Sequence, residues 1–515
     1  MLAGAFILSA VLAYTTPITI AAGAAGWVII ALVVHVAPGG RTISDRISIR
    51  RRFNRPVRDE AMVVDTNKHR AGMVIDDDKV SVFLELIGNP YELTRDVNSE
   101  KPSVPLEHVI GYLNSTSFPI HSVNVISYGR RVADGSAYAN IYGRSIASGS
   151  LSQARTIIQI TSSLTDSMHE VYRRAVAITP EITDKTTTIG VTRYMEAVAG
   201  SIRNHLLTHG VLTTIMSGRD VARFHGSVLE LVNHGIMQEK WDHLPGSESS
   251  PATRVFSTKQ PDVDMIDVGD HTAVLVSRTI APRGNLFDVT TVVGVCEDDG
   301  QIPSSMPTMT VEKGRQGDLA TRFLPLAKDP GMKFPPTVTM SGSDIVGKFP
   351  AVGMGVRVGV SAVRNDTGQL VPGDDDVYLS LAGTKNTLFY TDVPESVEMS
   401  LLKRLRASGS DAAMLVSDMA DKEMTEMADI PSVTGLRKYP VIAVQASKET
   451  VKPSPLCTVI AFTDNIPVSS RTNLHIDPVT NMATIRAGGV PRKFFWTTDA
   501  DERAFLAQSS TSRRR

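Results

Sequence analysis

The first forty residues of the chain contain no Lys, Arg, Asp or Glu, whereas the next eighteen contain seven arginines. The apolar block consists of Leu2–Thr15, a break at Thr15-Thr16-Pro17, and a second apolar run, Ile18–Val36. A membrane-spanning helix needs about 20 apolar residues, a length that the second run meets and the first falls short of. We predict a transmembrane helical hairpin over residues 1–38.

The arginines after the hairpin indicate its orientation. Basic residues next to a membrane span are enriched on its cytoplasmic side, so the basic juxtamembrane segment, residues 39–60, predicts a multi-pass plasma-membrane protein with most of its chain in the cytoplasm. Such clusters also favour contact with anionic lipid headgroups. The arginines concerned are Arg41, Arg46, Arg50, Arg51, Arg52, Arg55 and Arg58.

Two other topologies compete with the hairpin. A cleaved signal peptide requires a basic first region, which residues 1–4 do not supply. A single span over residues 18–36, preceded by one short re-entrant arm, remains open as an alternative.

The rest of the chain is long enough for two or three domains. Residues 41–58 hold seven of the 53 Lys and Arg but one of the 54 Asp and Glu, so the remainder has seven more acidic than basic side chains. A mildly acidic region argues against nucleic acid as a main partner, because phosphate binding needs a clustered basic face. Cys296 and Cys457 stand apart, without metal-type spacing, which fits a reducing compartment.

Strand-like and helix-like stretches alternate after the basic segment. A strand-like run closed by Gly88-Asn89-Pro90 predicts a strand at 80–87, and alternating apolar residues predict one at 122–128. Helical spacing predicts helices at 192–208 and 218–233. The strand–helix–strand spacing suggests parallel pairing in two mixed α/β units. We expect a first cytosolic α/β domain at 61–262, a strand-rich connecting region at 263–350, a second cytosolic α/β domain at 351–500 and a disordered basic tail at 501–515.

Two stretches have the spacing of a ligand site but lack part of its motif. Gly342–Lys348 has the Gly-x-x-x-x-Gly-Lys spacing of a phosphate-binding loop, but Phe349 replaces the Ser or Thr that binds Mg²⁺. His205 and His209 lie four residues apart on a predicted helix, without the glutamate that a hydrolytic zinc site needs. We predict no catalytic residue, cofactor or metal site, and expect a protein that is not an enzyme.

Several features occur in the order found in one family. They are the hairpin with its arginine-rich stretch, the helix containing 193–200, the Glu239-Lys240-Trp241 element, the glycine-rich entry 355–359 and the acidic strand entry 375–381. With these features the chain resembles the EccE family, membrane components of mycobacterial-type (ESX, type VII) secretion systems.

The resemblance implies a structural role. EccE-like proteins lie at the periphery of an inner-membrane complex with EccB-, EccC- and EccD-like subunits, in which the EccC-like subunit is the motor ATPase. The implied function is to scaffold the assembly that exports proteins across the plasma membrane. Trp241 and Lys240 are then candidate interface residues, since Trp is enriched at interface hot spots. Core packing is the alternative role for Trp241.

Paired α/β units are also a common framework for enzymes. A membrane-tethered transferase-like enzyme with a cytosolic α/β catalytic domain is therefore the alternative function. A transmembrane sensor is disfavoured, because the turn at residues 15–17 leaves almost no extracellular chain.

Overall fold

The computed structural model describes most of the chain after residue 61, in segments. They are residues 62–65, 71–76, 78–88, 93–94, 103–132, 137–146, 150–177, 184–232, 239–246, 251–260, 271–297, 301–325, 337–351, 353–380, 387–409, 412–415, 431–433, 441–445, 458–463, 466, 470, 473–487 and 490–511. The predicted hairpin, the basic segment and its seven arginines lie outside these residues. None of the helices in the described segments is long and apolar enough to cross a membrane.

The first sheet has eleven strands, and every strand pair in it is antiparallel. In sheet order its strands are β1 (Met62–Asp65), β2 (Gly72–Asp76), β3 (Lys79–Leu86), β7 (Gln153–Ser163), β6 (Ser122–Arg130), β10 (Ala273–Arg283), β11 (Leu286–Glu297), β9 (Ala252–Thr258) and β12 (Met309–Val311), with β8 (Thr213–Ile215) on β3 and β13 (Val338–Met340) on β11. The strand-rich connecting region expected at 263–350 thus contributes β10, β11, β12 and β13 to this sheet.

The parallel pairing predicted for the first unit is wrong. Helix α4 (Leu106–Ser115) does connect two strands of the same direction, β3 and β6, as a strand–helix–strand unit would. These strands are not neighbours, however, because β7 lies between them and runs antiparallel to both. The arrangement is a split β-α-β unit.

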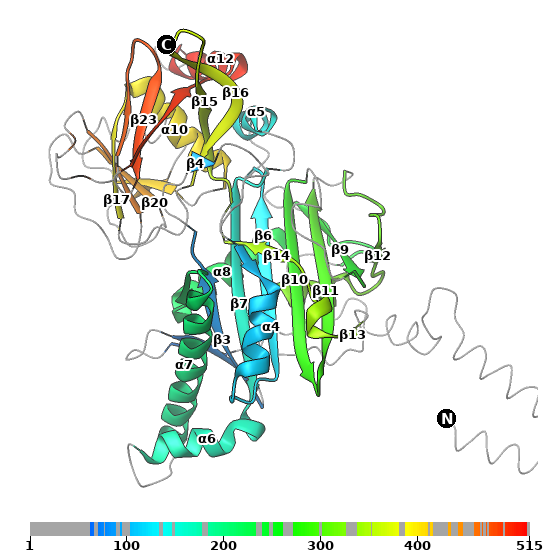
Figure 1. The fold of residues 1–515 in the computed structure, drawn as a ribbon. Helices are drawn as coiled ribbons and strands as arrows, with labels where there is room; N and C mark the ends of the chain where they lie inside the picture. The colour runs from blue at the N-terminus through cyan, green and yellow to red at the C-terminus, as the bar shows by residue number, and fades with distance from the viewer. Residues whose placement is uncertain are drawn as a thin grey trace, which may run out of the picture.

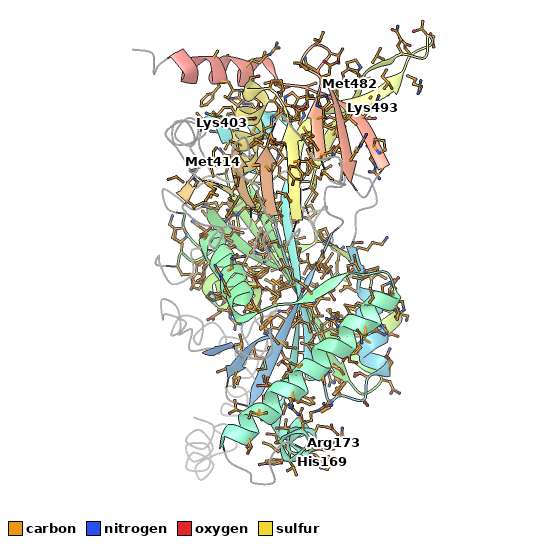
Figure 2. All side chains as sticks on the ribbon, turned by 90° about the vertical axis from the view of Figure 1, so that its left-hand side faces the viewer. His169, Arg173, Lys403, Met414, Met482 and Lys493 are labelled. Carbon is orange, nitrogen blue, oxygen red and sulfur yellow. The ribbon has the colours of Figure 1, made fainter. Side chains whose placement is uncertain are left out.

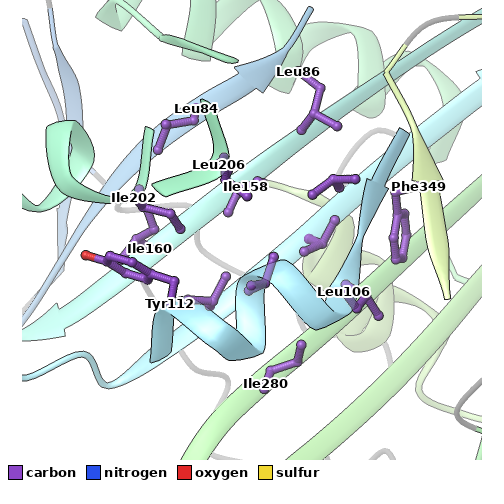
Figure 3. Packing of buried hydrophobic residues seen from close by; sticks show 14 of the residues in the cluster. Leu84, Leu86, Leu106, Tyr112, Ile158, Ile160, Ile202, Leu206, Ile280 and Phe349 are labelled. Carbon is purple, nitrogen blue, oxygen red and sulfur yellow. The ribbon is translucent and has the colours of Figure 1, made fainter. Parts of the chain in front are cut away.

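Helices cover both faces of the first sheet (Figure 1). Val82 and Leu84 of β3 pack with α4, α6 (Leu164–Val176) and α7 (Asp184–Thr208) on one face. Phe83, which points to the other side as strand geometry requires, packs with α8 (Gly218–Val232), α9 (Gln316–Ala320) and the 3-10 turn η2 (Thr321–Phe323). Figure 3 shows the first of these cores. A two-stranded sheet, β5 (Ser103–Pro105) with β14 (Lys348–Pro350), adjoins it.

The second sheet also has eleven strands and is mixed. Its parallel half, which confirms the parallel pairing predicted for the second unit, contains β19 (Ser432–Val433), β18 (Ala412–Leu415), β20 (Val441–Gln445), β21 (Thr458–Phe462), β17 (Thr387–Asp392) and β22 (Asn473–Ile476). The antiparallel half continues from β22 through β23 (Met482–Ala487), β24 (Val490–Trp496), β15 (Val356–Arg364), β16 (Leu370–Leu379) and β4 (Leu93–Thr94). Helix α10 (Glu395–Ala407) buries Leu401, Leu402 and Leu405 in its core.

The two sheets lie at opposite ends of the molecule (Figures 1 and 2). His169 and Arg173 of α6 mark one end, and Met482 and Lys493 of the second sheet mark the other (Figure 2). Two segments from the first half of the chain join the second sheet. Strand β4 pairs with β16, and α5 (Ala137–Ser145) packs against α10 and α12 (Ala500–Thr511).

Three stretches are more ordered than the sequence predicts. The composition of 129–155, rich in Gly, Ser and Ala, indicates a loop or a partly ordered crossover, but the stretch contains α5, which buries Tyr138 and Tyr142. The polar, Pro- and Ser-rich sequence at 244–262 indicates a connection, but it contains β9, all of whose residues are buried. The basic tail expected to be disordered at 501–515 is instead helical through Thr511. Its Glu502 is buried against partners far away in sequence, which local composition does not reveal.

Candidate interaction surface around Trp241

Trp241 lies in the described segment 239–246, which precedes β9. Leu244 forms an isolated antiparallel bridge with Thr253, with backbone N–H to carbonyl distances of 2.8 and 2.9 Å. Leu244 is buried in the core beneath α8. The segment is therefore fixed to the part of the first sheet where β9 and the edge strand β12 pair.

Arg254 of β9 holds the turn that follows Trp241. Its guanidinium donates from Nη2 to Asp242 Oδ2 (2.8 Å), from Nε to the Asp242 carbonyl (3.1 Å) and from Nη1 to the Pro303 carbonyl (2.6 Å). Burial alone would raise the pKa of Asp242, but the hydrogen bond to His243 and the charge of Arg254 outweigh it and hold that pKa below its usual value. The turn is thus fixed by a charged, multiply hydrogen-bonded contact.

Glu239, at the start of the segment, reaches the beginning of α9. Backbone N–H groups of Gln316 and Gly317 donate to its carboxyl group, which lowers its pKa, but burial has the larger effect and raises that pKa above the usual value. The Gln316 side chain in turn accepts from the Val255 N–H (2.6 Å) and donates to the Val255 carbonyl (3.0 Å). The segment, β9 and α9 therefore form one continuous hydrogen-bonded unit.

Trp241 itself is exposed over 45% of its surface. Its carbonyl accepts from the Gly314 N–H at 2.5 Å, and the neighbouring Lys240 N–H donates to the His243 carbonyl at 3.0 Å. Lys240 is also exposed. Such exposure does not fit the core-packing alternative. A surface indole on a fixed backbone can bind a partner with little cost of ordering, and Trp is among the residues that contribute most to interfaces.

The glycine-rich stretch with phosphate-loop spacing does not form such a loop. Residues Gly342–Asp344 form the 3-10 turn η3, and the chain then enters strand β14 at Lys348. Phosphate loops need a helix whose N-terminal N–H groups face the phosphate. In the described residues 345–351, strand β14 and not a helix follows this turn.

His205 and His209 are joined by a third histidine that sequence spacing did not identify. His108 of α4 lies with its ring centroid 4.4 Å from that of His209, and the rings of His205 and His209 are 4.7 Å apart. The His205 Nε2 is 3.0 Å from the His108 carbonyl oxygen. Because 97 residues separate His108 from His205, only the packing of α4 on α7 brings them together.

A second polar cluster that the sequence did not reveal lies beneath the second sheet. Arg404 of α10 and Glu502 of α12 form a buried ion pair, and Tyr138 of α5 and Ser400 also donate to Glu502. Arg404 also donates to two backbone carbonyls, so the cluster is a structural contact between helices. Nothing in the local pattern around Glu502 signals its burial.

In the part of the chain that the structure describes, no group of three or more His, Cys, Asp or Glu side chains is placed to hold a metal ion. No protein-family model matches the chain, and no match was found among the curated proteins.

Proposed function

We propose that this chain is a structural membrane subunit of a type VII (ESX) secretion complex, similar to EccE. It anchors in the plasma membrane through the N-terminal hairpin and contacts EccB-, EccC- or EccD-like subunits through its cytoplasmic region. The observation that carries the scaffold role is the exposed Trp241, whose backbone is fixed by β9, Arg254 and Gly314. The charge-free first forty residues and the seven arginines that follow support the membrane anchor.

The test is affinity purification of the tagged full chain from membranes in mild detergent, read by native gel and mass spectrometry. We expect one large complex that contains an FtsK-like ATPase and other membrane subunits. A solitary monomer or a small homo-oligomer would refute the scaffold role.

A substitution tests the surface itself. Truncation of an interface hot spot costs about 2 kcal/mol or more, which is about 30-fold in affinity. We therefore expect Trp241→Ala to lose most co-purified subunits while the thermal unfolding of the isolated protein stays unchanged. Leu207→Ala is the matched control, because Leu207 is a large apolar residue with 53% exposure elsewhere on the molecule. Equal recovery of the complex with both variants would place the interface away from Trp241.

A further inference from the structure

The described chain begins at the same end of the first sheet as helix α6. In the strand register, Met62 of β1 lies opposite Ile75, Ile75 lies opposite Val80, and Val80 lies opposite Ser162 of β7. Ser162 is two residues before the start of α6. Neighbouring strands lie about 4.8 Å apart, and three such spacings separate Met62 from Ser162, so Met62 lies roughly 14 Å from the start of α6.

The second sheet lies at the opposite end. Strand β7 runs from Gln153 to α6, and its start is bonded to the chain that leads into the second sheet, where the Gly355 N–H donates to the Ser152 carbonyl at 2.8 Å. Figures 1 and 2 show the same separation. Only residues 39–61 lie between the predicted hairpin and Met62. The α6 end is therefore the end of the molecule nearest to the predicted hairpin along the chain.

Helix α6 has one packed face and one outward face. Ser167, Val171 and Ala175 are buried, in part against α7. The outward face includes Tyr172 and Val176, which are 37% and 47% exposed, and Figure 2 shows Arg173 beside His169 at the tip of the molecule. The apolar stripe of α6 is buried within the protein, and its outward side presents aromatic, aliphatic and cationic side chains beside the acidic Asp166. Aromatic and cationic side chains are enriched where proteins meet a lipid interface.

The helix is held firmly in this position. Asp78, in the turn between β2 and β3, accepts hydrogen bonds from the Thr165 N–H (2.9 Å) and the Ser163 hydroxyl (2.9 Å). At Gly190 of α7, an added Cβ would lie 2.6 Å from the Val171 carbonyl oxygen, so the two helices touch closely there. The outward face of α6 is therefore a fixed feature of the fold.

We propose that the outward face of α6 lies against the lipid–water interface of the membrane that holds the N-terminal hairpin. Tyr172 and Val176 enter the headgroup region, and Arg173 contacts anionic headgroups. Arg173 also pairs with Glu170 at 2.6 Å, an exposed contact that headgroup phosphates can compete with. This proposal rests on the membrane anchoring in the proposed function. It fixes how the whole protein stands on the bilayer, with the second sheet farthest from it.

The test uses the full chain in vesicles of phosphatidylcholine and phosphatidylglycerol that contain nitroxide-labelled lipid. With Cys457→Ser as background, Val176→Cys and Val479→Cys carry a fluorophore in turn. Val479 is a matched control because it is a valine with 87% exposure, in the turn between β22 and β23. We expect the lipid to quench the label at 176 several-fold more than the label at 479. The additional change Arg173→Gln reduces that quenching.

A label at Val34→Cys, inside the predicted hairpin, separates the possible failures. Quenching at 34 without quenching at 176 overturns the α6 contact and leaves the membrane anchor standing. Absence of quenching at 34 refutes the anchor and with it the α6 contact. Equal quenching at 176 and 479 indicates nonspecific adsorption and overturns the proposal. If the label at 176 is shielded from the lipid quencher only when the other subunits are present, the outward face of α6 contacts a protein partner. This result also overturns the proposal.

Discussion

The ion pair between Arg404 and Glu502 supports a quantitative prediction about stability. Arg404 Nη2 is 2.6 Å from Glu502 Oε2, and Arg404 Nε is 2.9 Å from Oε1. The side chains are 1% and 5% exposed. Removal of one partner from such a buried pair leaves the other charge uncompensated and costs about 3–5 kcal/mol. We therefore expect Glu502→Gln to lower the free energy of unfolding by that amount at neutral pH.

The pH dependence gives the prediction a second signature. Burial alone would raise the pKa of Glu502, but the hydrogen bonds and charge of Arg404, with hydrogen bonds from Tyr138 and Ser400, outweigh it and lower that pKa. A carboxyl group with a lowered pKa in the folded state stabilises the fold above its unfolded pKa, about 4.3, and loses this contribution as the pH falls through the folded value. The difference between wild type and Glu502→Gln is thus largest at neutral pH and shrinks in acid.

Trp496 provides the assay. Its ring centroid lies 4.8 Å from the Arg404 guanidinium carbon, and its side chain is 5% exposed, so its fluorescence reports on this cluster. With Trp27→Phe and Trp241→Phe as background, urea unfolding of the detergent-solubilised full chain gives the free energy of unfolding for each variant.

An exposed pair of equal length provides the control. Arg173 and Glu170 are also 2.6 Å apart, but their side chains are 65% and 29% exposed. Exposed pairs contribute about 0–1 kcal/mol, so Glu170→Gln has a small effect. If Glu502→Gln costs no more than Glu170→Gln, burial does not determine the strength of these pairs, and the reasoning fails.

Three further measurements test other parts of the structure. Burial raises the pKa of Cys296 to about 12, so we expect this thiol to resist alkylation in the native protein, as read by peptide mass mapping; rapid modification would contradict its burial. Burial, followed by the neighbouring His209, lowers the pKa of His108 in the folded protein. His108 therefore binds a proton more readily in the unfolded state, and the stability of the fold falls as the pH drops through about 6.5. His108→Asn flattens this part of the thermal-unfolding profile, and an unchanged slope would exclude His108 as its source. At Gly359 an added Cβ would lie 1.9 Å from the Phe495 carbonyl oxygen, so Gly359→Ala costs about 1–3 kcal/mol or more in urea unfolding. Gly226→Ala in α8 meets no atom within 4 Å and raises stability by about 0.4–1 kcal/mol, and a loss of similar size at both glycines would refute the steric argument.

Elements with a strong local pattern could be predicted from the sequence. Helix α8 was expected at 218–233 and is observed at Gly218–Val232, because Val221, Phe224 and Val228 recur at helical spacing and all three are buried. Strand β3 follows its run of β-branched and apolar residues in the same way. In α8 one buried stripe decides the structure, whereas β3 is a nearly continuous apolar run that is buried on both faces of the sheet. Both patterns are visible directly in the sequence.

Strand neighbours could not be predicted in the same way. The common direction of β3 and β6 follows from the helix between them. The position of β7 between these two strands, however, depends on its pairing with β3, whose residues lie about 70 to 80 positions earlier in the chain. The same holds for the site residues. Trp241 could be chosen as a candidate because the Glu239-Lys240-Trp241 element and the enrichment of Trp at interfaces are visible locally, whereas the burial of Glu502 depends on Arg404, 98 residues away.

The interleaving of the two sheets bears on the proposed scaffold role. Domains joined by a single linker move relative to one another by default. Here β4 and α5, from the first half of the chain, complete the second sheet, and the Tyr142 hydroxyl accepts from the Arg357 N–H at 3.0 Å. The chain thus passes repeatedly between the sheets, which restrains their relative movement. If α6 contacts the membrane as proposed, that contact also sets the direction of the Trp241 surface and the position of the second sheet, as a rigid spacer between the bilayer and a partner requires.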